Sequence, residues 1–270
     1  MTRLLDALDA AGSESGPATS RSAVATNRRV AELLPELDWS SARLVDVGAG
    51  RGYFLGLLAR GLSGLGLSPA AHLSACDLFP ADFEVQGLRC AQAGDNGSAP
   101  FPDQAFDAVV SIEVIEHLEN SFQFLRELYR LAKPGATVIV TTPNTLHLQS
   151  RLRTLVFGFP TLFDPLPLAE SDPRFTSGHI LPISPYFLCL AAYRAGFTEI
   201  ELFTDRRKTG AALVGLLLAP LLLLGSLYHR LRLTQRHPQK WAQNKSWLKA
   251  QDGLDLLLGR TAILRARRPL

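Results

Sequence analysis

The feature that most constrains this chain is the stretch LVDVGAGRGYF at residues 44–54. Its apolar start predicts a buried strand, and three glycines follow it at G-x-G-x-G spacing, namely Gly48, Gly50 and Gly52. Glycines let backbone N–H groups approach a ligand where any Cβ would collide. A lone glycine-rich turn is a weak signal. On its own, therefore, this stretch predicts only a turn between a strand and a helix that wraps a small ligand.

Three acidic residues accompany this turn. Asp46 precedes the glycines, Asp77 follows the apolar stretch LSAC, and Asp95 lies in GDNGSAPFPDQAFDAVVSIEV. A strand, a glycine turn, a helix, a second strand and an acid in this order form a nucleotide-type βαβ unit. The G-x-G-x-G spacing differs from the G-x-G-x-x-G of dinucleotide binders. An acid just before the turn suits a cationic or amino-bearing ligand better than a phosphate.

At these positions the chain resembles the class I S-adenosylmethionine (SAM) methyltransferases of the type 11/23 group. VDVGAGRGYF is similar to their first motif, CDLF to the second, and GDNGSAPFPDQAFDAVVSIEVIEHL to the adenine-contacting and fourth-strand motifs. KPGATVIVTTPN is similar to the helix exit and fifth strand. The resemblance implies an α/β fold, a Rossmann-like seven-stranded, mostly parallel sheet with an antiparallel last strand and helices on both faces. A dehydrogenase or an unrelated doubly wound domain is the alternative.

The resemblance also implies which residues bind SAM. The set is Asp46, Gly48, Gly50, Gly52, Asp77, Leu78, Asp95, Asn96 and Glu113. Asp46 would lie near the amino group of the methionine part or order the turn. Asp77 would accept hydrogen bonds from both ribose hydroxyls, because a carboxylate has two acceptor oxygens. Asp95 would meet the adenine amino group. The alternatives are a solvated strand-end acid for Asp77 and a structural loop acid for Asp95.

A second group of reactive residues follows the fourth predicted strand. Glu113, Glu116 and His117 offer two carboxylates and an imidazole that could ligate a divalent cation. This E-x-x-E-H pattern resembles the metal site of small-RNA 3′-terminal 2′-O-methyltransferases and the corresponding segment of ubiquinone-biosynthesis O-methyltransferases. In both, a later histidine completes the cluster. His179 in SGHILPIS is the matching candidate, and His147 is the reserve.

Three roles remain open for this second group. A metal held there would bind an acceptor hydroxyl and lower its pKa. Without a metal, His117 or His179 could act as the general base, because imidazole titrates near neutral pH. Glu116 and His117 could instead only cap and orient the next helix. The candidate catalytic residues are therefore His117, His179 and Glu116, and the candidate metal ligands are these three with Glu113.

Hydrophobic patterning divides the chain into four parts. Residues 1–41 form an N-terminal segment with a helix over 22–37, and residues 42–205 with 260–270 form the main domain. Its predicted strands span 44–47, 73–79, 88–91, 105–112, 137–142, 198–204 and 261–266, and its predicted helices 53–60, 121–132 and 184–195. Residues 143–182, within this domain, are rich in proline and show little periodicity, so we expect a substrate lid. Residues 206–259 are an insertion between the last two strands.

The lid contains residues that could contact an acceptor. Its aromatic side chains are Phe157, Phe159, Phe163 and Phe175, which suit an apolar or sugar-stacking pocket but could also form the core of the lid itself. Arg151 and Arg153 could meet an anionic group such as a pyrophosphate. Solvated arginines are the alternative.

The insertion opens with an apolar run, residues 210–228, that contains no charge and has basic residues on both sides. The run is long enough to span a bilayer. However, Pro220 interrupts it, positive charge flanks both ends, and a single crossing would separate two strands of one sheet. We therefore expect a kinked helix or helical hairpin in one leaflet, with its basic flanks at anionic headgroups. A core helix or a dimer contact is the alternative.

Composition indicates the class of partner and the cellular compartment. A net charge of +3 is too small to indicate a nucleic-acid partner. Three cysteines without C-x-x-C spacing indicate buried thiols in a reducing compartment, and the N-terminus shows no signal-peptide pattern. The sequence thus predicts a cytoplasmic protein, peripheral on the inner face of the cytoplasmic membrane.

Together these patterns predict a SAM-dependent O-methyltransferase. We expect a small or lipid-linked amphiphilic acceptor, such as a glycan, polyprenyl or quinone-like hydroxyl. The alternatives are a metal-dependent RNA ribose 2′-O-methyltransferase and a non-catalytic SAM-binding subunit.

Overall fold

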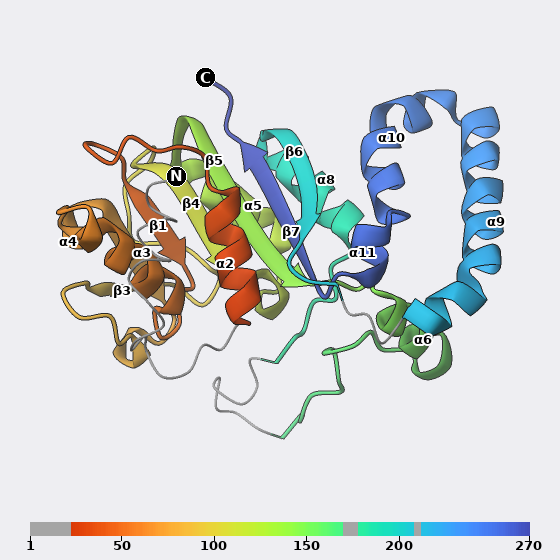
Figure 1. Ribbon diagram of the computed structural model, residues 1–270, viewed down its shortest axis with the longest axis horizontal. Helices are drawn as coiled ribbons and strands as arrows, with labels where there is room; N and C mark the ends of the chain where they lie inside the picture. The colour runs from red at the N-terminus through yellow and green to blue at the C-terminus, as the bar shows by residue number, and fades with distance from the viewer. Residues whose placement is uncertain (1–22, 170–177, 208–211) are drawn as a thin grey trace.

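The computed structural model describes residues 23–169, 178–207 and 212–270, and a seven-stranded sheet lies at its centre (Figure 1). The strands are β1 (Leu44–Val47), β2 (Leu73–Asp77), β3 (Cys90–Gln92), β4 (Phe106–Ile112), β5 (Ala132–Pro143), β6 (Thr198–Thr204) and β7 (Thr261–Arg267). Their order is β3-β2-β1-β4-β5-β7-β6, and β7 runs antiparallel to both of its neighbours. The predicted mostly parallel sheet with an antiparallel last strand is confirmed.

Helices cover both faces of this sheet. They are α2 (Val24–Leu33), α3 (Tyr53–Gly64), α4 (Pro69–His72), η1 (Pro80–Asp82), η2 (Ile115–His117), α5 (Ser121–Leu131), α6 (Leu148–Phe157), α8 (Pro185–Ala195), α9 (Ala212–Arg236), α10 (Pro238–Gln251) and α11 (Leu254–Leu258). The helical insertion between β6 and β7, which the sequence predicted, consists of α9, α10 and α11. The N-terminal segment before residue 23, Phe175 of the lid and residues 208–211 lie outside the described residues.

Two hydrophobic cores form because side chains alternate between the faces of each strand. On β1, Val45 and Val47 pack on the side of α5 and α8, whereas Leu44 packs on the side of α2 and α3. On β5, Val138 and Val140 belong to the first core and Ile139 to the second. Since both faces are covered, the central strands consist of nearly continuous apolar residues. This double burial holds the carboxyl ends of β1, β2 and β4 at one edge of the sheet.

Several element boundaries differ from the sequence prediction. Helix α2 ends at Leu33 rather than at residue 37, because Leu34 precedes Pro35 and adopts an extended conformation. Strand β2 ends at Asp77 rather than at residue 79, because the Asp77 carboxylate accepts a hydrogen bond from the Phe79 backbone at 2.8 Å and closes a turn. Helix α3 runs on to Gly64.

The expectation of little regular structure in the lid was wrong for one part of it. Residues 148–157 form helix α6, which begins at the cap residue His147 and ends at Gly158 in the left-handed conformation. His147 accepts a hydrogen bond from the Gln149 backbone at 3.2 Å. The cap residue His147 and the stop residue Gly158 are signals for this helix in the sequence. The nearby prolines made its apolar periodicity harder to recognise.

The insertion stands at the end of the molecule remote from α4 (Figure 1). Helices α9 and α10 lie antiparallel, and Asp252 after α10 binds Ser226 and Arg230 of α9. Tyr186 of α8 donates a hydrogen bond to Asn244 of α10 and so connects the insertion to the main domain. Among the helices of the described residues, none combines the length and apolarity needed to cross a bilayer.

Candidate functional site

The glycine turn between β1 and α3 is the first part of the site. Gly48, Gly50 and Gly52 all have positive φ, at 83°, 53° and 85°. A Cβ on Gly48 would come within 2.3 Å of Val114, and one on Gly52 within 2.4 Å of Val85. A Cβ on Gly50 would meet nothing within 4 Å. Gly48 and Gly52 therefore allow close packing of the turn, whereas Gly50 leaves open space beside the backbone.

Two acids lie beside this turn, and one of them binds it. Asp77 accepts a hydrogen bond from the Gly50 backbone at 2.7 Å with one oxygen and from the Phe79 backbone at 2.8 Å with the other. Each oxygen keeps a second lone pair for a ligand. Asp46 is fully buried, and its Oδ1 has no hydrogen-bond partner. Burial and the nearby charge of Asp77 raise the pKa of Asp46 to about 8.

Both acids border a cavity of about 820 Å³ at the carboxyl edge of the sheet. The predicted SAM-binding residues that line it are Asp46, Gly48, Gly50, Asp77, Leu78, Asp95 and Glu113. Gly52 shapes the turn without lining the cavity. Asn96 also stays outside, because its side chain accepts a hydrogen bond from the Ser98 backbone at 3.0 Å and closes its own loop.

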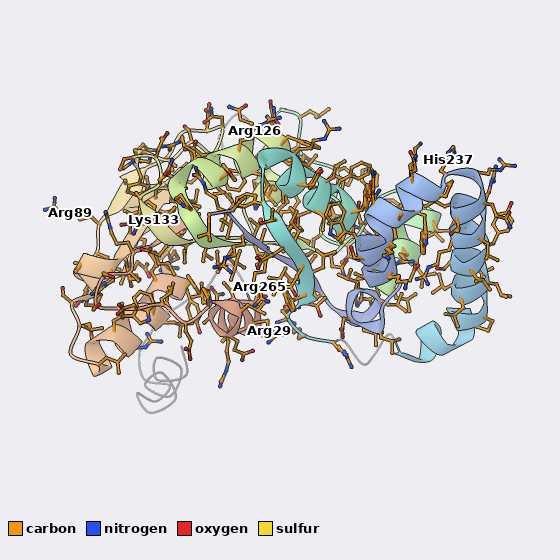
Figure 2. The ribbon with its side chains drawn as sticks, turned by 90° about the horizontal axis from the view of Figure 1, so that it is seen from above. Arg29, Arg89, Arg126, Lys133, His237 and Arg265 are labelled. Carbon is orange, nitrogen blue, oxygen red and sulfur yellow. The ribbon has the colours of Figure 1, made fainter. Side chains whose placement is uncertain are left out.

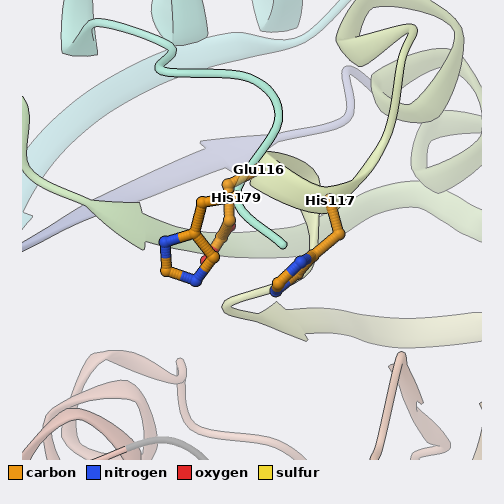
Figure 3. A group of neighbouring side chains, drawn as sticks. All are labelled: Glu116, His117 and His179. Atoms are coloured by element: carbon orange, nitrogen blue, oxygen red, sulfur yellow. The ribbon is translucent and has the colours of Figure 1, made fainter. Parts of the chain in front are cut away.

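The second predicted group gathers at the far wall of this cavity. Ligand atoms of Glu116, His117 and His179 all lie within 4.8 Å of one another (Figure 3). The rings of His117 and His179 meet edge to face, with centroids 4.8 Å apart. Both histidines line the cavity, and Glu116 lies behind them. The structure thus brings together residues that are more than 60 positions apart in the sequence.

The segment that carries His179 is tied to η2 by its backbone. Ile180 and Leu181 donate hydrogen bonds to the carbonyl of Glu116 at 2.9 and 3.0 Å. His117 Nδ1 lies 3.2 Å from the carbonyl of Gly178, and the ring of Phe163 packs on His179 at 5.2 Å. The histidine pair is therefore positioned by main-chain contacts on one side and by an aromatic side chain on the other.

Burial also sets the charge of this group. Glu116 is completely buried, and neither of its carboxylate oxygens has a hydrogen-bond partner. Burial, together with the neighbouring Glu113, raises the pKa of Glu116 well above its usual value. Burial and the neighbouring His117 lower the pKa of His179, whose Nδ1 has no partner. A neutral imidazole can accept a proton or ligate a metal.

Glu113 does not join the other three residues. Its carboxylate accepts a hydrogen bond from the Thr141 hydroxyl at 3.0 Å, and its own backbone N–H donates to the same hydroxyl. Burial raises the pKa of Glu113 to about 7, against the effect of Thr141. His147, the reserve ligand, caps α6 instead. Of the predicted metal set, the described residues therefore bring together Glu116, His117 and His179.

The arginines of the lid are engaged within the protein. Arg151 donates to the carbonyls of Leu146 and Gln251, at 2.8 and 3.0 Å. Arg153 donates to the carbonyl of Pro160 and pairs with Asp164. The sequence left two interpretations open, solvated arginines and arginines that bind a ligand. The structure shows a third role, because Arg151 and Arg153 both hold α6 to its surroundings.

Sequence reasoning did not assign several residues of the cavity wall, among them Thr26, Leu162, Arg206 and Arg260. Arg206 and Arg260 flank the insertion, and their charges lower the pKa of Glu113. Thr26 of α2 donates a hydrogen bond to Asp205 at 2.9 Å. No local pattern identifies these residues, because α2, the lid and the paired strands β6 and β7 bring them to the cavity from distant parts of the sequence.

The site fits SAM by its own geometry. The unpartnered Oδ1 of Asp46 is a buried acceptor without a donor, which suits the amino group of a methionine moiety. Asp77 presents two oxygens at the edge of the cavity, and Gly50 leaves the backbone accessible. The second group also fits a divalent cation, because two imidazoles and a buried carboxylate without hydrogen bonds form a suitable donor set.

The sheet order, the glycine turn and the acid that ends β2 together define the class of Rossmann-like, SAM-dependent methyltransferases. A family model described as a methyltransferase domain matches residues 20–202. The match covers more than half of the chain, so this chain belongs to that family. The resemblance of the sequence to SAM methyltransferases and the expectation of SAM as cofactor are thereby confirmed.

Characterised relatives match over shorter stretches. A mitochondrial ubiquinone biosynthesis O-methyltransferase from Dictyostelium discoideum is 31% identical over 133 residues, which is 44% of this chain and 40% of that protein. Ajmaline N-methyltransferase from Rauvolfia serpentina is 42% identical over 80 residues, 28% of this chain and 26% of that protein. The chain thus spans less than half the length of these relatives.

Solved structures agree on the fold. A SAM-dependent methyltransferase from Archaeoglobus fulgidus superposes with a TM-score of 0.52 at 16% identity, over 90% of this chain and 92% of that one. Phosphoethanolamine N-methyltransferase 2 from Haemonchus contortus, in complex with SAM, superposes with a TM-score of 0.50 at 18% identity, over 91% of this chain and 52% of that one. At these identities the likeness extends to the fold alone.

Proposed function

We propose that this protein transfers a methyl group from SAM to a hydroxyl oxygen of an amphiphilic acceptor at the inner face of the cytoplasmic membrane. A lipid-linked glycan, a polyprenyl compound or a quinone-like phenol would suit. The observation that carries this proposal is the pair His117 and His179 in the cavity wall, beside the apolar side chains of Val114 and Leu162. A hydroxyl acceptor needs a group that takes up its proton, and an apolar wall receives the rest of the molecule.

The cofactor lies across the glycine turn in this proposal. Asp77 holds the ribose, Asp46 receives the amino group of the methionine part, and Asp95 contacts the adenine. The open space at Gly50 and the two hydrogen bonds that Asp77 makes to the turn support this orientation. In this orientation the sulfonium methyl would face the wall that contains His117 and His179.

Methyl transfer is then a single displacement. The acceptor oxygen forms a bond to the methyl carbon while the bond between that carbon and sulfur breaks, and the electron pair stays on sulfur. The acceptor proton passes to an imidazole nitrogen of the pair His117 and His179, both of which line the cavity. Alignment and removal of water supply most of the rate.

A divalent cation is a second way to activate the same hydroxyl. Glu116, His117 and His179 would hold it, and it would supply a lower pKa of the bound hydroxyl. The unpartnered carboxylate of Glu116 favours this version, since a buried carboxylate without hydrogen bonds or a cation is costly. Metal analysis of protein purified without chelator decides between the versions, with Glu116→Gln as the variant that should lose the metal. Protein that remains active without metal contradicts this version.

The acceptor itself can be found by a screen. Purified protein is incubated with radiolabelled SAM and with separate lipid, polar and RNA fractions of a cell extract. We expect label in the lipid fraction. Label in RNA would support the ribose 2′-O-methyltransferase instead, which the E-x-x-E-H pattern favours. SAM binding without transfer to any fraction would support a non-catalytic SAM-binding subunit.

A further inference from the structure

Helix α9 exposes a row of apolar side chains in its second half. Five apolar side chains, each more than half exposed, follow one another at helical spacing: Leu223, Leu224, Leu227, Tyr228 and Leu231. Positions 222, 226, 230 and 233 on the other side are half-buried. Two of these are Ser226 and Arg230, which bind Asp252 at the end of α10. The other two are Leu222 and Leu233, so this part of the helix turns both leucines and polar groups inward and a further row of apolar side chains outward. This row is called the α9 stripe below.

A second exposed apolar group lies at the end of α6. Leu155 and Val156 are each 82% exposed, and Phe157 is 55% exposed. Phe157 and Phe159 stack with ring centroids 5.5 Å apart across Gly158. These four residues are called the α6 tip. Three residues further on, Leu162 lines the cofactor cavity, so a short segment of the chain connects the α6 tip to the wall of the site.

The α6 tip and the α9 stripe belong to one end of the molecule (Figure 1). Arg151 of α6 donates to the carbonyl of Gln251 at the end of α10, and the next residue, Asp252, binds Ser226 and Arg230 of α9. The two apolar groups are thus held on a connected set of helices. Large exposed apolar patches of this kind mark contacts with another molecule or with a membrane.

Charge identifies the partner. The three helices α6, α9 and α10 contain no aspartate or glutamate, although the whole chain has 25 of them. Their basic residues are Arg151, Arg153, Arg230, Arg232, Arg236, Lys240, Lys245 and Lys249. Arg151, Arg153 and Arg230 make contacts within the protein, the last two with Asp164 and Asp252. Apolar side chains beside Arg232, Arg236 and the lysines of α10 match a lipid surface with anionic headgroups. In a symmetric dimer, by contrast, two basic surfaces would face each other.

We infer that the α9 stripe and the α6 tip dock on an anionic lipid bilayer, and that the α6 tip leads the apolar part of a membrane-borne acceptor past Leu162 into the cavity. The second half of this inference rests on the proposed function. The first half does not, because docking needs neither SAM nor acceptor. Leucine side chains would enter the headgroup boundary, and Arg232 and Arg236 would contact lipid phosphates.

Vesicle sedimentation tests the docking with the full chain and without SAM or acceptor. Vesicles contain phosphatidylcholine alone or phosphatidylcholine with phosphatidylglycerol. We expect wild-type protein to sediment with the anionic vesicles, and to sediment less at high salt, because screening weakens attraction to the headgroups. The double variant Leu224→Glu/Leu227→Glu should lose about tenfold or more in the partition coefficient.

Matched controls separate docking from general changes of charge or polarity. The control for the added carboxylates is Leu65→Glu, which changes an exposed leucine at the end of α3 and should not weaken sedimentation. Arg232→Glu should weaken sedimentation, whereas Arg89→Glu should not, because Arg89 lies at the opposite end of the molecule from His237 and the insertion (Figure 2). All altered side chains are exposed, and far-ultraviolet circular dichroism with SAM calorimetry confirms that each variant folds.

Three outcomes would overturn the inference. Wild-type protein could fail to bind anionic vesicles, or the double variant could bind as well as wild type. Alternatively, sedimentation velocity could show a wild-type dimer that the double variant converts to a monomer, which would make the stripe an interface between two copies. In Leu155→Glu/Phe157→Ser, a loss of lipid methylation clearly larger than the loss of vesicle binding, with SAM affinity kept, would support the path past Leu162. Unchanged methylation there would refute that path but not the docking.

Discussion

The cavity has a cofactor side and an acceptor side, and different kinds of contact hold the residues of each side in place. On the cofactor side, contacts run between a turn and a strand end that follow each other in one βαβ unit, as in the hydrogen bond from Gly50 to Asp77. On the acceptor side, His117 and His179 meet from segments far apart, through backbone bonds between η2 and residues 180–181. The cofactor side depends on local geometry, and the acceptor side depends on the docking of a long loop. Substitutions should therefore separate binding of SAM from transfer of its methyl group.

The largest separation is expected for His179→Ala. Loss of a proton acceptor or metal ligand should reduce turnover by roughly 10²- to 10⁴-fold, while SAM affinity stays within about twofold because the turn is untouched. Turnover and isothermal titration calorimetry measure the two quantities. His237→Ala, at an exposed histidine before α10, is the control (Figure 2). A parallel loss of SAM affinity in His179→Ala would show that the two sides are not independent.

Asp77→Ala should produce the converse effect. Removing the carboxylate deletes the acceptor for the ribose and for the backbone of Gly50 and Phe79. SAM affinity should fall at least tenfold, since a hydrogen bond to a charged group contributes about 1.5–3 kcal/mol. Asp95→Ala should lower affinity less, because Asp95 lies in an exposed loop. Calorimetry that finds unchanged affinity for Asp77→Ala would remove the ribose assignment.

Gly48→Ala tests the close packing of the turn. A methyl group there would collide with Val114 at a position whose φ is 83°. We expect thermal denaturation to show a loss of about 1–3 kcal/mol in the free energy of unfolding. Gly66→Ala is the matched control, because its φ is 74° but a Cβ meets nothing within 4 Å. Equal losses in the two variants would mean that backbone strain, and not the contact with Val114, is responsible.

The smallest effect is expected for the pH dependence of SAM affinity, which depends on one proton of Asp46. Asp46 has a pKa of about 8, so it is mostly protonated in free protein at pH 7. An amino cation placed beside it favours the carboxylate, which lowers that pKa and releases a proton. SAM affinity should therefore rise with pH up to about 8 and fall above it, because the α-amino group of SAM then loses its own proton. Calorimetry at pH 7 in two buffers of different ionisation enthalpy should show release of nearly one proton for wild type and none for Asp46→Asn. No release from wild type would place the amino group elsewhere.

The difference between the two sides also explains what could be predicted. Asp46, Gly48, Gly50 and Asp77 were found because strand, turn and acid follow one another at short spacing. Asn96 was assigned by position in a motif, yet its side chain turns back to Ser98. Glu113 was grouped with Glu116 for the same reason, whereas Thr141 on the neighbouring strand binds its carboxylate. Side-chain direction in such loops depends on partners that a motif does not contain.

On the acceptor side, local sequence patterns did not predict most of what the structure shows. Helix α6 was not predicted, although His147 and Gly158 are ordinary cap and stop residues, because proline-rich sequence on both sides hid its period. The pairing of His117 with His179 was expected only from a resemblance. Leu162, Arg206 and Arg260 reach the cavity through loop docking and strand pairing, and no spacing in the chain indicates that.

Short segments of the sequence were enough to predict the sheet, the glycine turn and an unusually apolar insertion, because burial on both faces and glycine conformations are local properties. The contacts between distant segments bury both oxygens of Glu116 behind two histidines, and they leave a row of leucines of α9 exposed while Ser226 and Arg230 bind Asp252. A sequence shows that a residue is apolar, but it does not show whether its side chain is buried or exposed. Whether they form a core or a surface depends on which face the neighbouring helix covers.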